Sequence, residues 1–202
     1  MALDTALCGF STFGIRVPRY VCGVRLFKGI EANVLDDAGA VDVPLALARR
    51  LDVVLLGVHP YTTYQPGSVT KNTDALLRAM ERHPYADIIS HPCQRGFAVD
   101  VRVVAPLARE QGVALEINES VLAWNRVDAA AVVDMIQAAE AERVGLSLGS
   151  DAHYVDELGL DTHIEDVLAR AGGAPRIVNR MLADAEAFVD ARRQRRNSLA
   201  GG

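Results

Sequence analysis

The sequence has few cysteines and no long apolar run, and these absences exclude several classes of protein. Its three cysteines, Cys8, Cys22 and Cys93, are an odd number without CxxC spacing, which argues against a disulfide framework and for a reducing compartment. No apolar run approaches the length that spans a bilayer, and the start, MALDTALCGF, lacks the basic beginning and long apolar centre of a signal peptide. We therefore expect a cytoplasmic protein with no membrane partner.

An excess of positive charge is also missing. The formal net charge is −5, which gives no broad attraction for nucleic acid phosphates, so we expect no nucleic acid partner. The one dense basic run comprises Arg192, Arg193, Arg195 and Arg196. We interpret it as the solvated end of a last helix, where cations suit the helix dipole, followed by a frayed tail over residues 194–202.

What is present is the composition of a globular protein. Half of the 202 residues are hydrophobic and 23% are charged, which is enough for a substantial core. No linker or repeat divides the chain, so we predict a single domain over residues 1–202 with an atypical start at residues 1–22. Short apolar runs alternate with helical patterns, which is typical of βα units in an α/β fold.

The predicted strands are short, rich in Val, Ile and Leu, and not alternating, as expected for strands covered on both faces. They are Val24–Ile30, Val53–Val58, Ala86–Ser90, Val113–Ile117, Val144–Leu148 and, weakly, Arg176–Val178. The helical patterns between them begin at small polar residues such as Asn72 and Thr73, Asp100 and Asp128. The predicted helices are Val43–Arg50, Thr73–Arg82, Val101–Gln111, Ala129–Glu142, Asp156–Ala171 and Asn179–Arg193.

Polar side chains follow five successive predicted strands. They are Glu31 after KGI, His59 after VVLLGV, His91 after DIIS, Asn118 after ALEI, and Asp151 with His153 after GLSLGS. In parallel α/β folds the carboxyl ends of the strands form the functional face. The sequence therefore predicts one site at this end of the sheet.

Histidine nitrogen and carboxylate oxygen are the usual ligands of Zn²⁺, Mn²⁺ and Fe²⁺ in hydrolytic sites, so we predict one to three divalent ions here. The carboxylates of Glu31 and Asp151 could hold a metal-activated water, which suits phosphoryl transfer. Each residue alone has a plainer interpretation: His59 could be a structural, hydrogen-bonded histidine, and Asp151 could cap a helix. The repeated placement at strand ends favours the metal site.

These residues lie in segments that together resemble a known family. The segments KGIEAN, GVHP, ISHP, LEINES and GSDAH occur in the order and approximate spacing of the polymerase and histidinol phosphatase (PHP) domain family, and the small bacterial phosphatases are its most similar branch. The resemblance implies a distorted (β/α)7 barrel with up to three metals. By position, Glu31, His59 and His91 would hold one metal, Asp151 a second and His153 a third, while Asn118 and Arg95 would contact substrate.

The sequence also departs from the family pattern. Family members begin with a His-x-His strand, a further histidine and a TDH segment, whereas this chain has no histidine before His59. About six βα units are predicted, so the barrel is expected to be incomplete at the N-terminus. Either a misplaced start or real degeneration explains this, and an uncovered sheet edge would permit a homo-oligomer.

Three functions follow from this reading. The first is metal-dependent hydrolysis of a small phosphate monoester. The second is a truncated or degenerate PHP domain, weak or inactive in catalysis, that binds a metal or ligand or serves as an interaction module. A PHP-like nuclease or proofreading module fits less well, because the chain is acidic.

Overall fold

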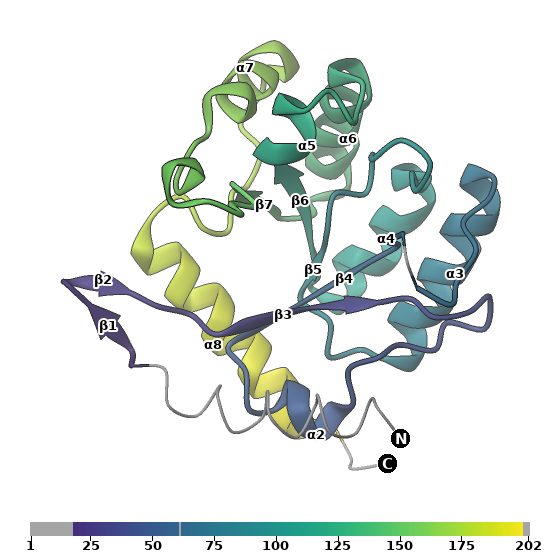
Figure 1. Cartoon of the computed structure of the whole chain (residues 1–202), viewed down its shortest axis with the longest axis horizontal. Helices are drawn as coiled ribbons and strands as arrows, with labels where there is room; N and C mark the ends of the chain where they lie inside the picture. The colour runs from purple at the N-terminus through teal and green to yellow at the C-terminus, as the bar shows by residue number, and fades with distance from the viewer. Residues whose placement is uncertain (1–17, 61, 200–202) are drawn as a thin grey trace.

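A sheet of five parallel strands forms the centre of the structure, a computed structural model that describes residues 18–60 and 62–199. The strands are β3 (Gly29–Asn33), β4 (Val53–Gly57), β5 (Ile88–Ile89), β6 (Ala114–Asn118) and β7 (Leu146–Gly149). They lie side by side in sequence order (Figure 1). Beyond β7, Ile177 forms a single parallel bridge with Leu146, where a weak sixth strand was predicted. The predicted α/β class is therefore confirmed.

The first predicted strand, Val24–Ile30, is wrong in its bounds. Val24 belongs to β2 (Val24–Arg25), which pairs antiparallel with β1 (Tyr20–Val21) in a hairpin that extends from the body of the molecule (Figure 1). Its two-residue turn, Cys22 and Gly23, has φ values of 49° and 82°, and positive φ at both positions is typical of a tight hairpin turn. The sheet strand β3 instead begins at Gly29, opposite Val53.

Helices connect the strands. They are α2 (Leu45–Ala48), α3 (Val69–Arg82), α4 (Val101–Gln111), α5 (Glu119–Ala123), α6 (Ala129–Glu142), α7 (Thr162–Ala171) and α8 (Leu182–Ser198), with a 3₁₀ turn η1 (Val155–Glu157). The predicted bounds of α4 and α6 are confirmed, because Asp100 and Asp128 cap their first backbone N–H groups as expected. None of the helices in the described part of the chain is long and apolar enough to cross a membrane.

The predicted bounds of four helices shift, and the helix predicted at Val43–Arg50 is shortened to α2 (Leu45–Ala48). Helix α3 begins after Ser68, whose side chain accepts from the Lys71 N–H, rather than at Thr73. The helix predicted from Asp156 starts only at Thr162, because η1 and Gly159, with φ of 75°, turn the chain first. Helix α8 starts later than predicted and continues to Ser198, so residues 194–198 are helical and the predicted frayed tail is wrong there. Residues 1–17 of the atypical start and 200–202 of the tail lie outside the described residues.

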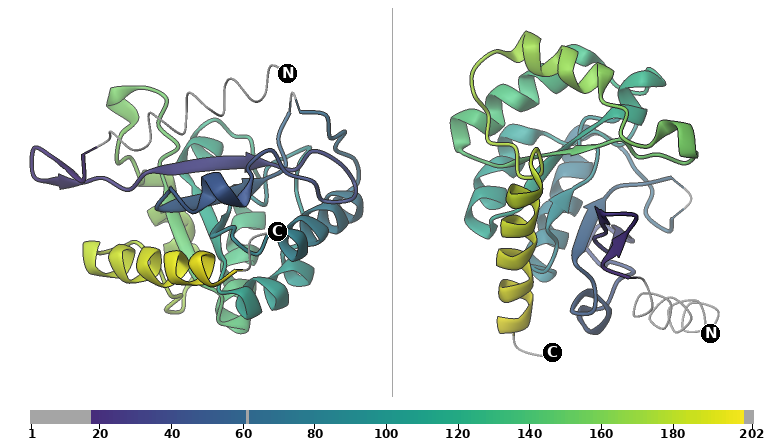
Figure 2. Two further views of the ribbon diagram at one scale, coloured as in Figure 1. Left: turned by 90° about the horizontal axis from the view of Figure 1, so that it is seen from below. Right: turned by 90° about the vertical axis from the view of Figure 1, so that its left-hand side faces the viewer.

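The two faces of the sheet are covered unequally. One face packs its apolar side chains, such as Leu56, Ile89 and Leu115, into the main core beneath the helices. The other face holds a smaller cluster around Ile88, against which Phe188 of α8 packs. Figure 2 shows α8 running apart from the helices that cover the first face. Only the first face therefore has the thick cover that the continuous apolar runs predicted.

The basic run in α8 is not simply a solvated helix end. Arg192 and Arg196 are 4% and 1% exposed and both bind the carboxylate of Asp87, which is fully buried just before β5. Arg192 Nε donates to Asp87 Oδ1 at 2.8 Å, and the Val54 N–H donates to Asp87 Oδ2 at 2.7 Å. Because an unpaired buried charge is costly, these groups are buried together. They fasten α8 across the amino ends of the strands.

Candidate metal centre

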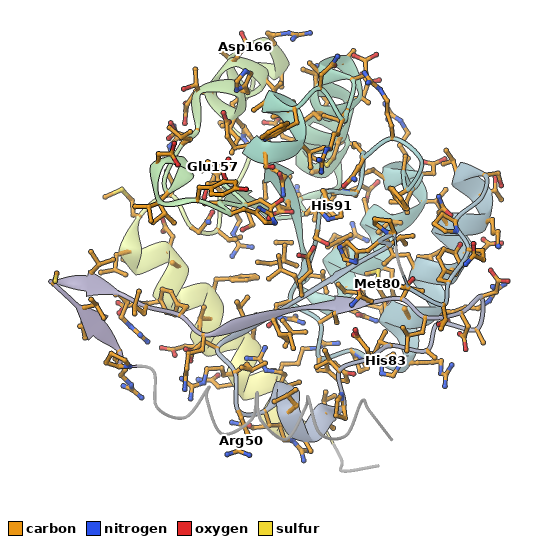
Figure 3. The ribbon with its side chains drawn as sticks, in the orientation of Figure 1. Arg50, Met80, His83, His91, Glu157 and Asp166 are labelled. Atoms are coloured by element: carbon orange, nitrogen blue, oxygen red, sulfur yellow. The ribbon has the colours of Figure 1, made fainter. Side chains whose placement is uncertain are left out.

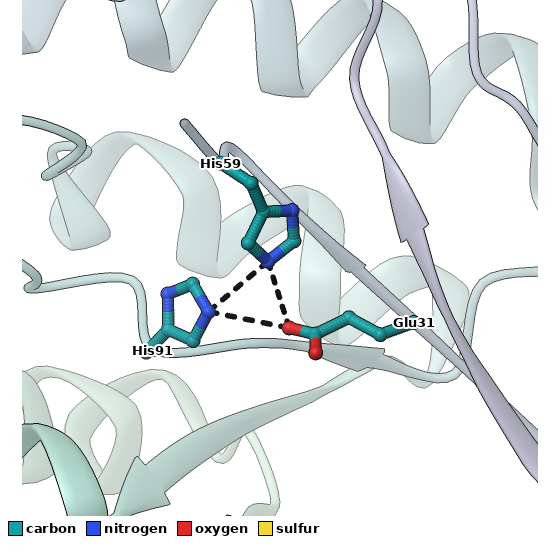
Figure 4. Close-up of side chains that lie close together, drawn as sticks. All are labelled: Glu31, His59 and His91. Atoms are coloured by element: carbon teal, nitrogen blue, oxygen red, sulfur yellow. Dashed lines mark hydrogen bonds and ion pairs between the residues drawn. The ribbon is translucent and has the colours of Figure 1, made fainter. Parts of the chain in front are cut away.

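Three predicted ligands converge at the carboxyl end of the sheet. His59 Nε2 lies 2.8 Å from Glu31 Oε1, and His91 Nε2 lies 3.2 Å from the same oxygen. The two Nε2 atoms are 3.1 Å apart, and the rings meet edge to face (Figure 4). Within the described residues, this is the one group of three or more His, Cys, Asp or Glu side chains whose ligand atoms lie close enough to share an ion.

Strand pairing explains why residues so far apart in sequence meet. Glu31 lies in β3, and His59 and His91 follow the neighbouring strands β4 and β5, so all three reach the same edge. The absence of a side chain at Gly57 leaves room for the His59 ring and for Ser90. A Cβ on Gly57 would lie 2.7 Å from His59 Cε1 and would clash with Ser90 Oγ. Glycine is therefore required at the end of β4 by the ring that follows it.

The electrostatics of the group favour an ionised carboxylate. Burial alone would raise the pKa of Glu31, but the hydrogen bonds from His59 and His91 outweigh it and hold that pKa well below its ordinary value. Burial alone would lower the pKa of His91, but the hydrogen bond that its ring donates to Glu31, with the charges of Glu116 and Asp151, raises it. The group thus concentrates negative charge beside two imidazoles.

Glu116 supports the centre and was missed by the sequence analysis. The residue is 7% exposed, and its Oε2 accepts the His91 backbone N–H at 2.9 Å. His91 has φ of 27°, which is uncommon for a residue with a side chain, so this hydrogen bond holds a sparsely populated backbone. Gly149 makes room on the other side, because a Cβ there would clash with Glu116 Oε1. Since Glu116 lies two residues before Asn118 in one strand, the strand period already placed both on one face.

Asp151 and His153 lie outside the three-residue group. Asp151 follows β7 with φ of 51°, and its charge is near enough to raise the pKa of His91. The His153 side chain is 71% exposed, and its Nδ1 lies 2.9 Å from the Asp151 backbone oxygen. Their roles as ligands of a second and a third metal therefore stay predictions.

The two predicted substrate contacts are engaged within the protein. Asn118 is buried, accepts the Val121 N–H at 2.9 Å and donates to Glu116 Oε2 at 3.2 Å, so it caps α5 and positions the glutamate. Arg95 Nη1 donates to the Asn125 backbone oxygen at 2.7 Å. Substrate contact by either residue stays a prediction.

His83 lies at the end of α3, well apart from His91 (Figure 3). Its Nδ1 is 3.1 Å from the Tyr85 hydroxyl, and burial lowers its pKa. His83 thus serves as a natural reference for variants of the centre.

The donor set fits a divalent cation. Two imidazole nitrogens and one carboxylate oxygen are a common ligand set in zinc sites, and ligand atoms about 2.1 Å from a tetrahedral ion lie about 3.4 Å from each other. The three separations here, 2.8, 3.1 and 3.2 Å, need only a small expansion to reach that spacing. In addition, His59 Nδ1 and Ser90 Oγ are buried beside the group without hydrogen-bond partners in the described structure. Such unsatisfied atoms are more typical of a functional centre than of a finished structural network.

Comparison with known proteins gives the chain its relatives. It is 39% identical over 168 residues to a "Probable phosphatase" of Syntrophotalea carbinolica, covering 82% of this chain and 69% of that protein. It is 34% identical to "Probable phosphatase TTE1963" of Caldanaerobacter subterraneus subsp. tengcongensis over 71% of this chain and 56% of that protein, and 31% identical to a "Probable phosphatase" of Clostridium botulinum over 81% and 66%. No family model matches the chain. The chain spans roughly 56–69% of the lengths of these relatives, and it belongs to the family of these bacterial probable phosphatases.

Proposed function

We propose that the chain binds a divalent metal ion through Glu31, His59 and His91 and hydrolyses a phosphate monoester of a small molecule. The observation that carries the proposal is the convergence of these three side chains from adjacent strands, with ligand atoms at most 3.2 Å apart. The names of the relatives support the reaction class. Phosphatase activity and metal binding are linked because a bound metal ion supplies an activated water and neutralises phosphoryl charge.

The side chains of the centre have separate tasks in this proposal. Glu31 is ionised at neutral pH, since its pKa is lowered even below the ordinary value despite burial, so its carboxylate is available as an anionic ligand without losing a proton. His59 and His91 each present Nε2 toward the carboxylate. Glu116 fixes the His91 backbone, which sets where the imidazole points.

The finer features of the proposal come from the PHP resemblance. They are closure of the sheet into a distorted barrel, Zn, Mn or Fe as the metal, and further ligation by Asp151 and His153. The parallel order of β3 to β7 and the position of Asp151 at the same end as His91 support this reading. A small phosphorylated molecule is the expected substrate class.

A second candidate function is metal or ligand binding without turnover. It is favoured by one observation: the described residues bring together ligands for a single ion, whereas the resemblance implies up to three. A single metal can still activate a water, so the two candidates differ in turnover rather than in binding.

Metal analysis and phosphate release test the proposal together. Purified protein is expected to retain about one equivalent of metal and to release phosphate from p-nitrophenyl phosphate with Mn²⁺ or Zn²⁺. His91→Ala is expected to abolish both, and His83→Ala, which removes a histidine outside the group, to leave both unchanged. Metal retention without phosphate release would favour the binding module. The absence of both metal retention and phosphate release would refute both functions.

A further inference from the structure

A large hollow lies at the end of the sheet opposite the metal centre. It has a volume of about 670 Å³ and runs along α8, from Asp184 to Ser198, against the ends of α4 and α6. Its floor includes Ala114, the first residue of β6, and Gly145, just before β7, so it lies at the amino ends of the strands. A volume of this size is in the range of small-molecule sites, which run from about 300 to 1,000 Å³.

The lining of this hollow is strongly basic. Five arginines line it, against two acidic residues, in a chain whose net charge is −5. The arginines are Arg109, Arg143, Arg176, Arg192 and Arg195, and the acids are Glu110 and Asp184. Concentrated positive charge on an acidic protein therefore calls for a local explanation.

Three of the arginines already have acidic neighbours. Arg192 binds Asp87, Arg109 lies 3.6 Å from Glu142, and the charge of Glu110 acts on Arg195. Asp184, the other acidic residue of the lining, accepts the Met181 N–H at the start of α8. These contacts account for part of the basic lining as ordinary structural pairing.

Arg143 and Arg176 have no such partner in the part of the chain that the structure describes. Neither forms an ion pair within 4.0 Å with any residue in the described ranges, and both are exposed. Arg176 Nη1 lies 4.0 Å from the position that a Cβ on Gly145 would take, so it reaches over the floor of the hollow. Gly145 itself follows Arg143 by two residues in the sequence. Two arginines without an ion-pair partner among the described residues thus line one cavity.

The backbone at Arg143 adds a second observation. Arg143 ends α6 in the left-handed conformation, with φ of 59°, a position where glycine is the usual residue. The corresponding residue of α4 is Gly112, with φ of 67°, in the same hollow. A cation at a helix end gains some dipole energy, but lysine or arginine one turn earlier would gain it without the unfavourable φ. The guanidinium is therefore better explained by its place in the hollow.

We propose that this hollow binds a phosphorylated small organic molecule, with its phosphate between Arg143 and Arg176. Guanidinium groups bind phosphate oxygens through paired, charge-assisted hydrogen bonds, which makes arginine well suited to this group. The rest of the molecule would lie along Ala187, Phe188 and Ala191 of α8, which give the hollow an uncharged wall. The site is separate from the metal centre and does not depend on the proposed hydrolysis.

Calorimetric titration with adenosine 5′-monophosphate tests the proposal on the full chain. Metal is first removed with a chelator so that the ligand is not hydrolysed, and the chelator is then removed by dialysis. One site per chain is expected, and adenosine without its phosphate is expected to bind at least about tenfold more weakly. The variant Arg143→Gly/Arg176→Gln is expected to lose at least about tenfold in affinity, whereas His59→Ala/His91→Ala is expected to bind as the unchanged chain does.

Two further variants keep the test decisive. Arg143→Lys/Arg176→Lys retains both charges but not the paired donors, so an intermediate affinity is expected. If the first double variant does not fold, Ala187→Glu, on the exposed side of α8, places a negative charge at the hollow and is expected to reduce binding. Equal affinity in Ala187→Glu or in the arginine variants, loss of binding only in the histidine variants, or no binding at all would overturn the proposal.

Discussion

Replacing Asp87 by alanine is expected to destabilise the fold more than any exposed substitution in α8. The carboxylate is fully buried and accepts from Arg192, Arg196 and the Val54 N–H. Alanine would leave two guanidinium groups without a counter-charge, at 4% and 1% exposure, and one backbone N–H without an acceptor. All three losses occur at the contact between α8 and the amino ends of β4 and β5.

The size of the effect follows from these contacts. Breaking a buried ion pair costs about 3–5 kcal/mol, and an unsatisfied buried N–H adds about 1–3 kcal/mol. Water entering the space left by the side chain offsets part of this, so we expect Asp87→Ala to lower the free energy of unfolding by about 4–6 kcal/mol. Since small domains are stable by only about 5–15 kcal/mol, the variant would be close to unfolding at room temperature.

Urea denaturation followed by circular dichroism measures the difference. Asp190→Ala, on the exposed side of α8, is the matched control and is expected to change the free energy of unfolding by at most about 0.5 kcal/mol. A triple variant with leucine in place of Asp87 and methionine in place of Arg192 and Arg196 is expected to lose less free energy of unfolding than Asp87→Ala alone, because no buried charge is left unpaired. A loss below about 1 kcal/mol in Asp87→Ala would refute the reasoning.

The remaining predictions concern the metal centre. Glu116→Gln is expected to weaken zinc binding by about 10–100-fold, measured by competition with a chromophoric chelator, and unchanged affinity would show that the carboxylate does not hold His91 in place. Gly149→Ala is expected to cost about 1–3 kcal/mol in urea denaturation, because its Cβ would displace Glu116; a neutral result would contradict the packing. In the metal-free chain, the raised pKa of His91 contributes stability that is fully present below its ordinary 6.5 and is lost as pH rises through the raised value. The free energy of unfolding should therefore fall as pH rises above 6.5, and it should fall less steeply in His91→Ala. The lowered pKa of Glu31 contributes stability above its ordinary 4.5 that is lost as pH falls, so Glu31→Gln should flatten the acid side of the same stability curve.

Local signals made parts of the fold predictable. Helices α4 and α6 lie within the predicted bounds because the N-cap aspartates, Asp100 and Asp128, act on backbone groups two residues away. The site edge was predictable for a similar reason, since Glu31, His59 and His91 each follow an apolar strand and parallel strands place such residues together.

The features that were missed depend on partners distant in sequence. No local pattern indicates that Arg192 is buried, because its partner Asp87 lies 105 residues earlier. The start of β3 depends on pairing with β4, and the tight turn at Cys22 and Gly23 separates Val24 from the sheet. The role of Glu116 depends on the backbone of His91, 25 residues before it, so strand period alone indicated its face but not its task.

The ligands of the metal centre come from three neighbouring strands, so they meet only when these strands are paired in the correct register. The ligand from β3 is 28 residues from His59, which is itself 32 residues from His91, so no short peptide from this chain carries the set. An ion held here would act as a cross-link over loops of those lengths and would favour the state in which three strands are paired. A slip of β3 by one residue against β4 would turn Glu31 to the opposite face, and the cross-link would be lost with the alignment.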